Sequence, residues 1–130
     1  MAKKILLIED EPRQIEIYEK VISEAGFEIE SLKWGKEGLQ RLEEIKAKKK
    51  EKPDLILLDL ILPDINGILI LEKAKSDPEF KDIPFFILTN YSDPELKKMG
   101  KDLGAEKHII KTDLTPSQLV GVIKNYLKDK

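Results

Sequence analysis

Five polar residues of this chain each follow a short apolar run. Glu9 and Asp10 follow Ile-Leu-Leu-Ile, Asp59 follows Leu-Ile-Leu-Leu, Thr89 follows Phe-Phe-Ile-Leu, and Lys111 follows His-Ile-Ile. Such runs are typical of strands buried on both faces, so each residue marks the end of a strand. The carboxyl ends of parallel strands share one edge of a sheet, where ligands bind. Three acids, a hydroxyl and an ammonium at that edge would suit a hard cation and a phosphoryl group.

The predicted chemistry of this edge is phosphoryl transfer to a carboxylate. Crowded carboxylates repel one another, so the cluster must either take up protons or bind a cation. Because the chain has no cysteine and only one histidine, a site made of oxygen ligands predicts Mg²⁺, with Mn²⁺ as the alternative. Asp59 is the candidate nucleophile, since it ends the central strand and a carboxylate can attack phosphorus. Lys111 and Thr89 would neutralise and position the transferred group. Taken singly, each residue would more often be a capping or solvated group.

The composition predicts one cytoplasmic domain that spans residues 1–130, with no output domain. The length of 130 residues matches one ordinary domain. With 23 basic and 25 acidic residues the net charge is -2, which favours neither nucleic acid nor an anionic membrane as a partner. No apolar stretch approaches the roughly 20 residues of a membrane span. The lack of cysteine fits a reducing compartment.

Hydrophobic periodicity and turn signals predict five alternating strands and helices. We expect strands at 3–8, 27–32, 55–58, 84–88 and 108–110, and helices at 12–25, 36–48, 68–75, 94–104 and from 116 onwards. This alternation indicates a parallel sheet with helices on both faces, in three α/β/α layers. The mixed polarity of the second strand places it at an edge. The fold class is therefore α/β, a flavodoxin-like (βα)5 doubly wound sheet with strand order 2-1-3-4-5.

Motifs along nearly the whole chain resemble one family. They are Ile5 to Glu11, Pro53 to Leu60 with Leu62-Pro63-Asp64 and Gly67, Ile87-Leu88-Thr89, Gly104-Ala105, and Ile109-Ile110-Lys111. In this order they resemble the CheY-like receiver domain of two-component response regulators. Because the match involves several motifs in the right order, it is far more specific than any one of them.

The resemblance implies a role for each acidic residue. Asp59 would accept a phosphoryl group from a histidine of a sensor kinase or a phosphotransfer protein, in a Mg²⁺-dependent reaction. Asp10 would bind the metal directly, and Glu9 mainly through water. The backbone carbonyl of Ile61 would complete the protein ligands. The chain would catalyse only its own phosphorylation and its slow dephosphorylation.

The resemblance also implies a switch and a docking surface. Thr89 would follow the phosphoryl group, Lys111 would pair with it, and His108 would stand at the aromatic switch position. The signal would pass to an unknown protein target in trans. Ile17 and Val21 fall beside the buried stripe of the first helix, and we expect them to be exposed and to contact the phosphodonor. A monomer and a dimer formed on switching are both compatible with this sequence.

Three positions depart from the family pattern. Asn90 stands where a small residue is usual, with Tyr91 behind it. His108 replaces the aromatic switch residue, as a proton sensor or simply as a ring that fills the position. Thr112 stands where a proline usually follows the lysine. Since neither Ile61 nor Tyr91 suits the positioning of an attacking water, we predict slow self-dephosphorylation.

Three other functions remain to be weighed. The main alternative is a degenerate receiver that serves as a phosphorylation-independent interaction module. A haloacid-dehalogenase-like enzyme would need a second acid where Ile61 stands. A flavodoxin-like flavin binder would need a loop of glycines and hydroxyls where the acidic segment 9–12 lies. The intact set of acids, threonine and lysine favours the receiver.

Overall fold

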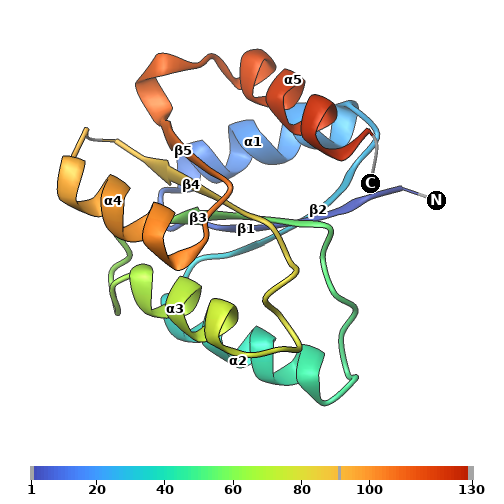
Figure 1. The fold of residues 1–130 in the computed structure, drawn as a ribbon. Coiled ribbons are helices and arrows are strands. Elements are labelled where there is room, and N and C mark those ends of the chain that lie inside the picture. Colours follow the sequence, from blue (N-terminus) through green and yellow to red (C-terminus); the bar gives the residue numbers. More distant parts are fainter. Residues whose placement is uncertain (1, 91, 129–130) are drawn as a thin grey trace.

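The computed structural model describes residues 2–90 and 92–128 and contains five strands and five α-helices in alternation (Figure 1). A 3-10 helix, η1, precedes the last α-helix. The elements are β1 (Lys4–Ile8), α1 (Pro12–Glu24), β2 (Glu28–Leu32), α2 (Gly35–Lys46), β3 (Leu55–Asp59), α3 (Ile68–Ser76), β4 (Phe85–Thr89), α4 (Pro94–Leu103), β5 (Lys107–Ile110), η1 (Lys111–Asp113) and α5 (Pro116–Leu127).

The five strands form one parallel sheet in the order β2-β1-β3-β4-β5, as predicted. Figure 1 shows α1 and α5 over one face of this sheet and α2, α3 and α4 over the other. β2 lies at an edge, and β1 and β3 are neighbours. The loops that follow β1 and β3 therefore meet at the point where the connections diverge to opposite faces, which is where ligands bind in sheets of this kind.

The three inner strands, β1, β3 and β4, are buried on both faces and contribute to two separate cores. Alternate residues of a strand point to opposite sides of the sheet. In β1, Leu6 and Ile8 pack in the core beneath α2, α3 and α4, whereas Ile5 and Leu7 pack in the core beneath α1 and α5. This two-sided burial explains why these three strands appear as continuous apolar runs in the sequence.

Local capping defines several helix ends. The Asp93 carboxylate accepts hydrogen bonds from two backbone N–H groups at the start of α4, and Pro94 occupies the first turn. α4 ends at Gly104, which adopts a left-handed conformation with φ of 102°. Thr115 and Gln118 form a reciprocal capping box at the start of α5.

The element boundaries differ from the predicted ones by at most two residues. Asp59 and Thr89 are the last residues of their strands rather than the first residues beyond them, because each still pairs with the neighbouring strand. α2 ends at Lys46, two residues early, and Lys48 has a positive φ of 65° that a helix cannot accommodate.

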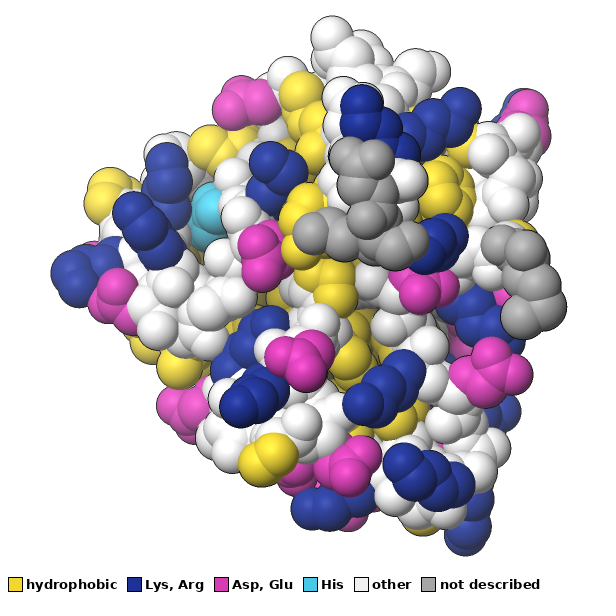
Figure 2. Space-filling model, turned by 45° about the vertical axis from the view of Figure 1, so that its right-hand side comes forward, with side chains coloured by type: hydrophobic (Ala, Val, Ile, Leu, Met, Phe, Trp, Pro, Cys, Tyr) yellow, Lys and Arg dark blue, Asp and Glu magenta, His cyan; other side chains and the backbone are white. Residues whose placement is uncertain are grey.

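The surface carries both signs of charge. On the face in Figure 2, basic and acidic side chains are interspersed and apolar side chains lie between them. None of the helices over residues 2–90 and 92–128 has the length and apolar character that crossing a lipid bilayer requires.

Candidate functional site

The sheet edge brings together the three predicted acids. Carboxylate oxygens of Glu9, Asp10 and Asp59 lie within 4.8 Å of one another. Glu9 and Asp59 are buried, and Asp10 is half-buried. Glu9 and Asp10 directly follow β1, and Asp59 is the last residue of β3, so the adjacency of these strands creates the cluster. A hard, all-oxygen donor set of this kind fits Mg²⁺ or Mn²⁺.

Lys111, the first residue after β5, also contacts the cluster. Its Nζ donates hydrogen bonds to Glu9 Oε1 and to Asp59 Oδ2, the latter at 3.0 Å. Burial raises the pKa of Glu9, although the Lys111 ammonium opposes this effect. Burial acts to lower the pKa of Lys111, but the carboxylates of Glu9 and Asp59 outweigh it and raise that pKa. A single buried ammonium thus contacts two of the three clustered carboxyl groups, and the site favours additional positive charge.

The loop after β3 binds the second carboxylate oxygen of Asp59. Oδ1 accepts a hydrogen bond of 2.9 Å from the backbone N–H of Ile61. Ile61 itself is 59% exposed. Gly67 packs directly against the end of β3, since a Cβ placed on Gly67 would lie 2.5 Å from the backbone oxygen of Asp59. The loop therefore positions both the Asp59 side chain and the Ile61 backbone.

Thr89 lies at the same edge, as predicted. It is buried at the end of β4, one residue beyond the position that pairs with Asp59. Asn90 behind it is exposed, and Tyr91 lies outside the described residues, so its predicted place beside the phosphoryl group is not described. The Lys111–Thr112 peptide bond, like every other in the described part, is trans.

His108 is a half-buried residue of β5. Neither ring nitrogen has a hydrogen-bond partner among the described residues. Burial lowers the pKa of His108, the nearby Lys97 lowers it further, and Asp93 raises it. These effects favour the neutral ring, which is consistent with a histidine that fills an aromatic position.

The two predicted docking residues differ in exposure. Ile17 on α1 is exposed at 36%, as expected. Val21 is half-buried rather than exposed, because it packs against the core between α1, α5 and the sheet. The expectation that both side chains are exposed is therefore wrong for Val21, since its place on the helix turns part of it inwards.

Asp64 is a candidate that the sequence interpretation left without a role. Its carboxylate accepts hydrogen bonds from the backbone N–H groups of Gly35 at 2.8 Å and Lys36 at 2.9 Å. These groups open α2, which begins after Trp34, and an indole side chain has no acceptor. A helix without a capping residue of its own is the one sequence signal that could have prompted a search for an external cap.

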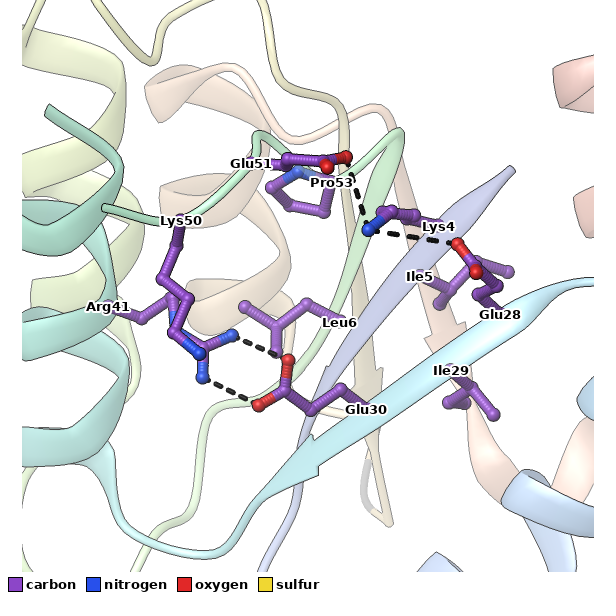
Figure 3. Close-up of a pocket in the computed structure, with 10 residues that line it drawn as sticks. All are labelled: Lys4, Ile5, Leu6, Glu28, Ile29, Glu30, Arg41, Lys50, Glu51 and Pro53. Carbon is purple, nitrogen blue, oxygen red and sulfur yellow. Dashed lines mark hydrogen bonds and ion pairs between the residues drawn. The ribbon is translucent and has the colours of Figure 1, made fainter. Parts of the chain in front are cut away.

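A separate hollow of about 230 Å³ lies near the amino ends of β1 and β2 (Figure 3). It is distinct from the carboxyl edge that holds Glu9, Asp10 and Asp59, which we call the acidic edge. Its charged side chains pair with one another: Arg41 binds Glu30 through two hydrogen bonds of 2.7 and 2.6 Å, and Lys4 contacts Glu28 and Glu51. Because these charges are already compensated, this hollow carries no chemistry comparable to that of the acidic edge.

Comparisons with known proteins agree on one family. The family model described as the response regulator receiver domain matches residues 5–124. The polar-differentiation response regulator DivK of Brucella anthropi is 29% identical over 132 residues, which cover 99% of each chain. The phosphorylated cyanobacterial phytochrome response regulator RcpA superposes with a TM-score of 0.84 and 30% identity, over 97% of this chain and 91% of its own. The Mn²⁺-bound form of response regulator Rcp1 superposes with a TM-score of 0.84 and 26% identity, over 95% of this chain and 93% of its own.

Proposed function

The chain belongs to the family of response regulator receiver domains, and on this premise we propose that Asp59 accepts a phosphoryl group in a reaction that requires a divalent cation. The observation that carries the proposal is the buried Asp59 carboxylate, which shares the Lys111 ammonium with Glu9 beside the half-buried Asp10. The phosphorylated relative RcpA supports the same chemistry. These findings do not favour the alternative of a degenerate interaction module.

Mg²⁺ is the cation that we propose for this site, with Mn²⁺ as a substitute. Asp10 and Asp59 would hold it directly, Glu9 through water, and Ile61 through its backbone carbonyl. The oxygen cluster and the Mn²⁺-bound relative Rcp1 support this assignment. When bound, the cation would neutralise negative charge on the phosphoryl oxygens.

The phosphoryl transfer needs little beyond positioning and charge. The Asp59 carboxylate attacks phosphorus, the bond between phosphorus and the donor breaks, and the donor leaves with the bonding electrons. Lys111 already contacts Asp59 and would pair with the new phosphoryl oxygens. The Thr89 hydroxyl, at the end of the adjacent strand, would donate to one of them. The reaction proposed is thus self-phosphorylation, followed by slow hydrolysis.

Thr89 and His108 would carry the change to the protein surface. A phosphoryl group that engages Thr89 would shift the populations of two arrangements of α4, β5 and α5. A target protein in trans with unequal affinity for the two arrangements would receive the signal. His108 lies on β5 within this region, and its unpartnered ring can change place without the loss of a hydrogen bond to the described residues.

We propose that a histidine kinase or phosphotransfer protein docks on α1 around Ile17, with the exposed part of Val21 at the margin. Ile17→Glu should slow transfer from the protein donor and leave phosphorylation by acetyl phosphate unchanged. Leu69→Glu is the matched control, because Leu69 is an exposed aliphatic residue on α3, which covers the opposite face. Equal losses with both donors would contradict this docking site.

Intact mass spectrometry after incubation with acetyl phosphate and Mg²⁺ tests the proposed function. We expect one added phosphoryl group in the wild type and none in Asp59→Asn or in the presence of EDTA. The adduct should persist well beyond seconds, since the Ile61 side chain cannot orient water for attack. If none of several phosphodonors gives an adduct, the proposal is contradicted and the interaction module is favoured.

A further inference from the structure

The loop between β3 and α3 is closed on itself at its base. The Ile61 N–H binds the Asp59 carboxylate, and Ile61 forms an isolated antiparallel bridge with Asn66. The N–H of Gly67 donates to the carbonyl of Leu60 at 2.8 Å. These contacts tie the base of the loop to Asp59 and Leu60 at the end of β3, and none of them holds the tip of the loop around Asp64.

The tip of the loop is held by a residue that contacts another helix. The two oxygens of the Asp64 carboxylate bind separate N–H groups, those of Gly35 and Lys36, in the first turn of α2. Burial acts to raise the pKa of Asp64, but the hydrogen bonds from Lys36 and Gly35 outweigh it and lower that pKa. The carboxylate is therefore charged at neutral pH, and it faces the positive end of a helix.

The contact between the loop and α2 is also sterically tight. A Cβ placed on Gly35 would lie 2.3 Å from Ile65 Cγ1 and 3.2 Å from Asp64 Oδ1. Only glycine permits this approach without movement of the Ile65 side chain. The tip of the loop is thus held by two hydrogen bonds and by a close packed contact on the same helix turn.

We propose that Asp64 is a positioning residue for the phosphorylation site, in addition to its role as the cap of α2. By holding the tip of the loop, it keeps the backbone of Ile61 in place, and this backbone both donates to Asp59 and offers the carbonyl for the cation. Asp64 itself touches neither group. This inference rests on the proposed function, because it assigns the loop a task in cation binding and phosphorylation.

A role in capping alone predicts a different outcome from a role in positioning. Loss of the cap weakens α2 and lowers stability whether or not the loop matters to the site. Loss of positioning also weakens cation binding in protein that remains fully folded. Partners that orient metal ligands typically contribute 10–100-fold in affinity.

The test compares Asp64→Ala and Asp64→Asn with Glu37→Ala. Glu37 is a matched control because its Oε1 accepts the Trp34 N–H at 3.2 Å, at the start of the same helix but without contact to the loop. Mn²⁺ affinity is measured from the electron paramagnetic resonance signal of free Mn²⁺. The initial rate of phosphorylation by acetyl phosphate is measured at saturating Mg²⁺, and stability by urea unfolding.

We expect Asp64→Ala to weaken Mn²⁺ binding roughly tenfold and to slow phosphorylation. Asp64→Asn retains one acceptor oxygen and should lie between Asp64→Ala and the wild type, which decides the matter if the alanine variant does not fold. Glu37→Ala should lose stability but keep wild-type Mn²⁺ affinity. Wild-type affinity and rate in a folded Asp64 variant, or an equal loss of affinity in Glu37→Ala, would overturn the inference. A wild type that neither binds Mn²⁺ nor accepts a phosphoryl group would overturn the proposed function itself, and this inference with it.

Discussion

Charged residues cluster at both the amino and the carboxyl ends of the strands, but the two clusters differ in burial and in the balance of charge. In the hollow at the amino end, three cations, Lys4, Arg41 and Lys50, lie beside three carboxylates, those of Glu28, Glu30 and Glu51. At the carboxyl end, Glu9 and Asp59 share the single ammonium of Lys111, and all three residues are buried. The first arrangement is balanced, whereas the second leaves negative charge in excess. An unbalanced buried cluster costs stability, which suggests that it is retained for binding and chemistry rather than for folding.

The pKa shifts in the two regions have opposite signs. The hydrogen bonds from Arg41 lower the pKa of Glu30, while burial acts more weakly in the other direction. At the acidic edge, burial dominates and raises the pKa of Glu9 despite the contact with Lys111. The protein therefore favours the charged form of one glutamate and disfavours that of the other. Substitutions in the two regions should reveal this difference.

Replacement of Lys111 should have the largest effect on stability. Lys111→Met removes the only cation that contacts Glu9 and Asp59 among the described residues. Without metal, it should lower the free energy of unfolding by about 3 kcal/mol, because two buried carboxylates lose their partner. Urea unfolding in EDTA measures this. Lys4→Met, in the hollow, is the control and should change little. Similar losses in both variants would remove the contrast between the two clusters.

Replacement of Arg41 should have a smaller effect, confined to stability. Arg41→Met keeps the apolar part of the side chain and removes the paired contact with Glu30. We expect a loss of about 1 kcal/mol, as for a well-aligned ion pair near the surface. Phosphorylation by acetyl phosphate should proceed at the wild-type rate. A slower reaction would show that the hollow is coupled to the acidic edge.

The pH dependence of two glutamine variants should differ in sign, in metal-free buffer. The raised pKa of Glu9 means that its contribution to stability is present below about pH 4.5, the ordinary pKa of glutamate, and is lost as the pH rises through the raised pKa. Glu9→Gln should therefore gain stability relative to the wild type as the pH rises from 4.5 towards 7.

The contribution of Glu30 has the opposite dependence. Its pKa is lowered, so its stabilising effect is present above about pH 4.5 and is lost as the pH falls through the lowered pKa. Glu30→Gln should lose stability relative to the wild type as the pH rises through the lowered pKa to about 4.5, and the difference should stay constant above that pH. Urea unfolding at four or five pH values resolves the two slopes. Slopes of the same sign would mean that the two environments do not differ as described.

The sequence predicts the acidic edge well because strand ends are local features. Each apolar run identifies a buried strand, and the order 2-1-3-4-5 follows from the alternation of elements and the polarity of β2. Glu9, Asp59, Thr89 and Lys111 are therefore found together once the strands are placed. The structure shows in addition that all four are buried.

Contacts between distant loops and helices could not be predicted in this way. Asp64 meets α2 at residues 28 and 29 positions earlier in the chain, and no periodicity connects the two segments. The pairing of Arg41 with Glu30 depends on how α2 lies over β2. The partial burial of Val21 depends on the packing of α1 beside α5. These features follow from tertiary geometry rather than from local pattern.

The most direct test of this account is the effect of Mg²⁺ on unfolding of the wild type and of Asp10→Asn. If the acidic edge has an excess of negative charge that a cation neutralises, Mg²⁺ at 100 times its dissociation constant should stabilise the wild type by about 2.7 kcal/mol. Asp10→Asn should be more stable than the wild type in EDTA, because it relieves repulsion, and should gain little from Mg²⁺. A wild type that does not respond to Mg²⁺, or an Asp10→Asn variant that responds equally, would contradict the account.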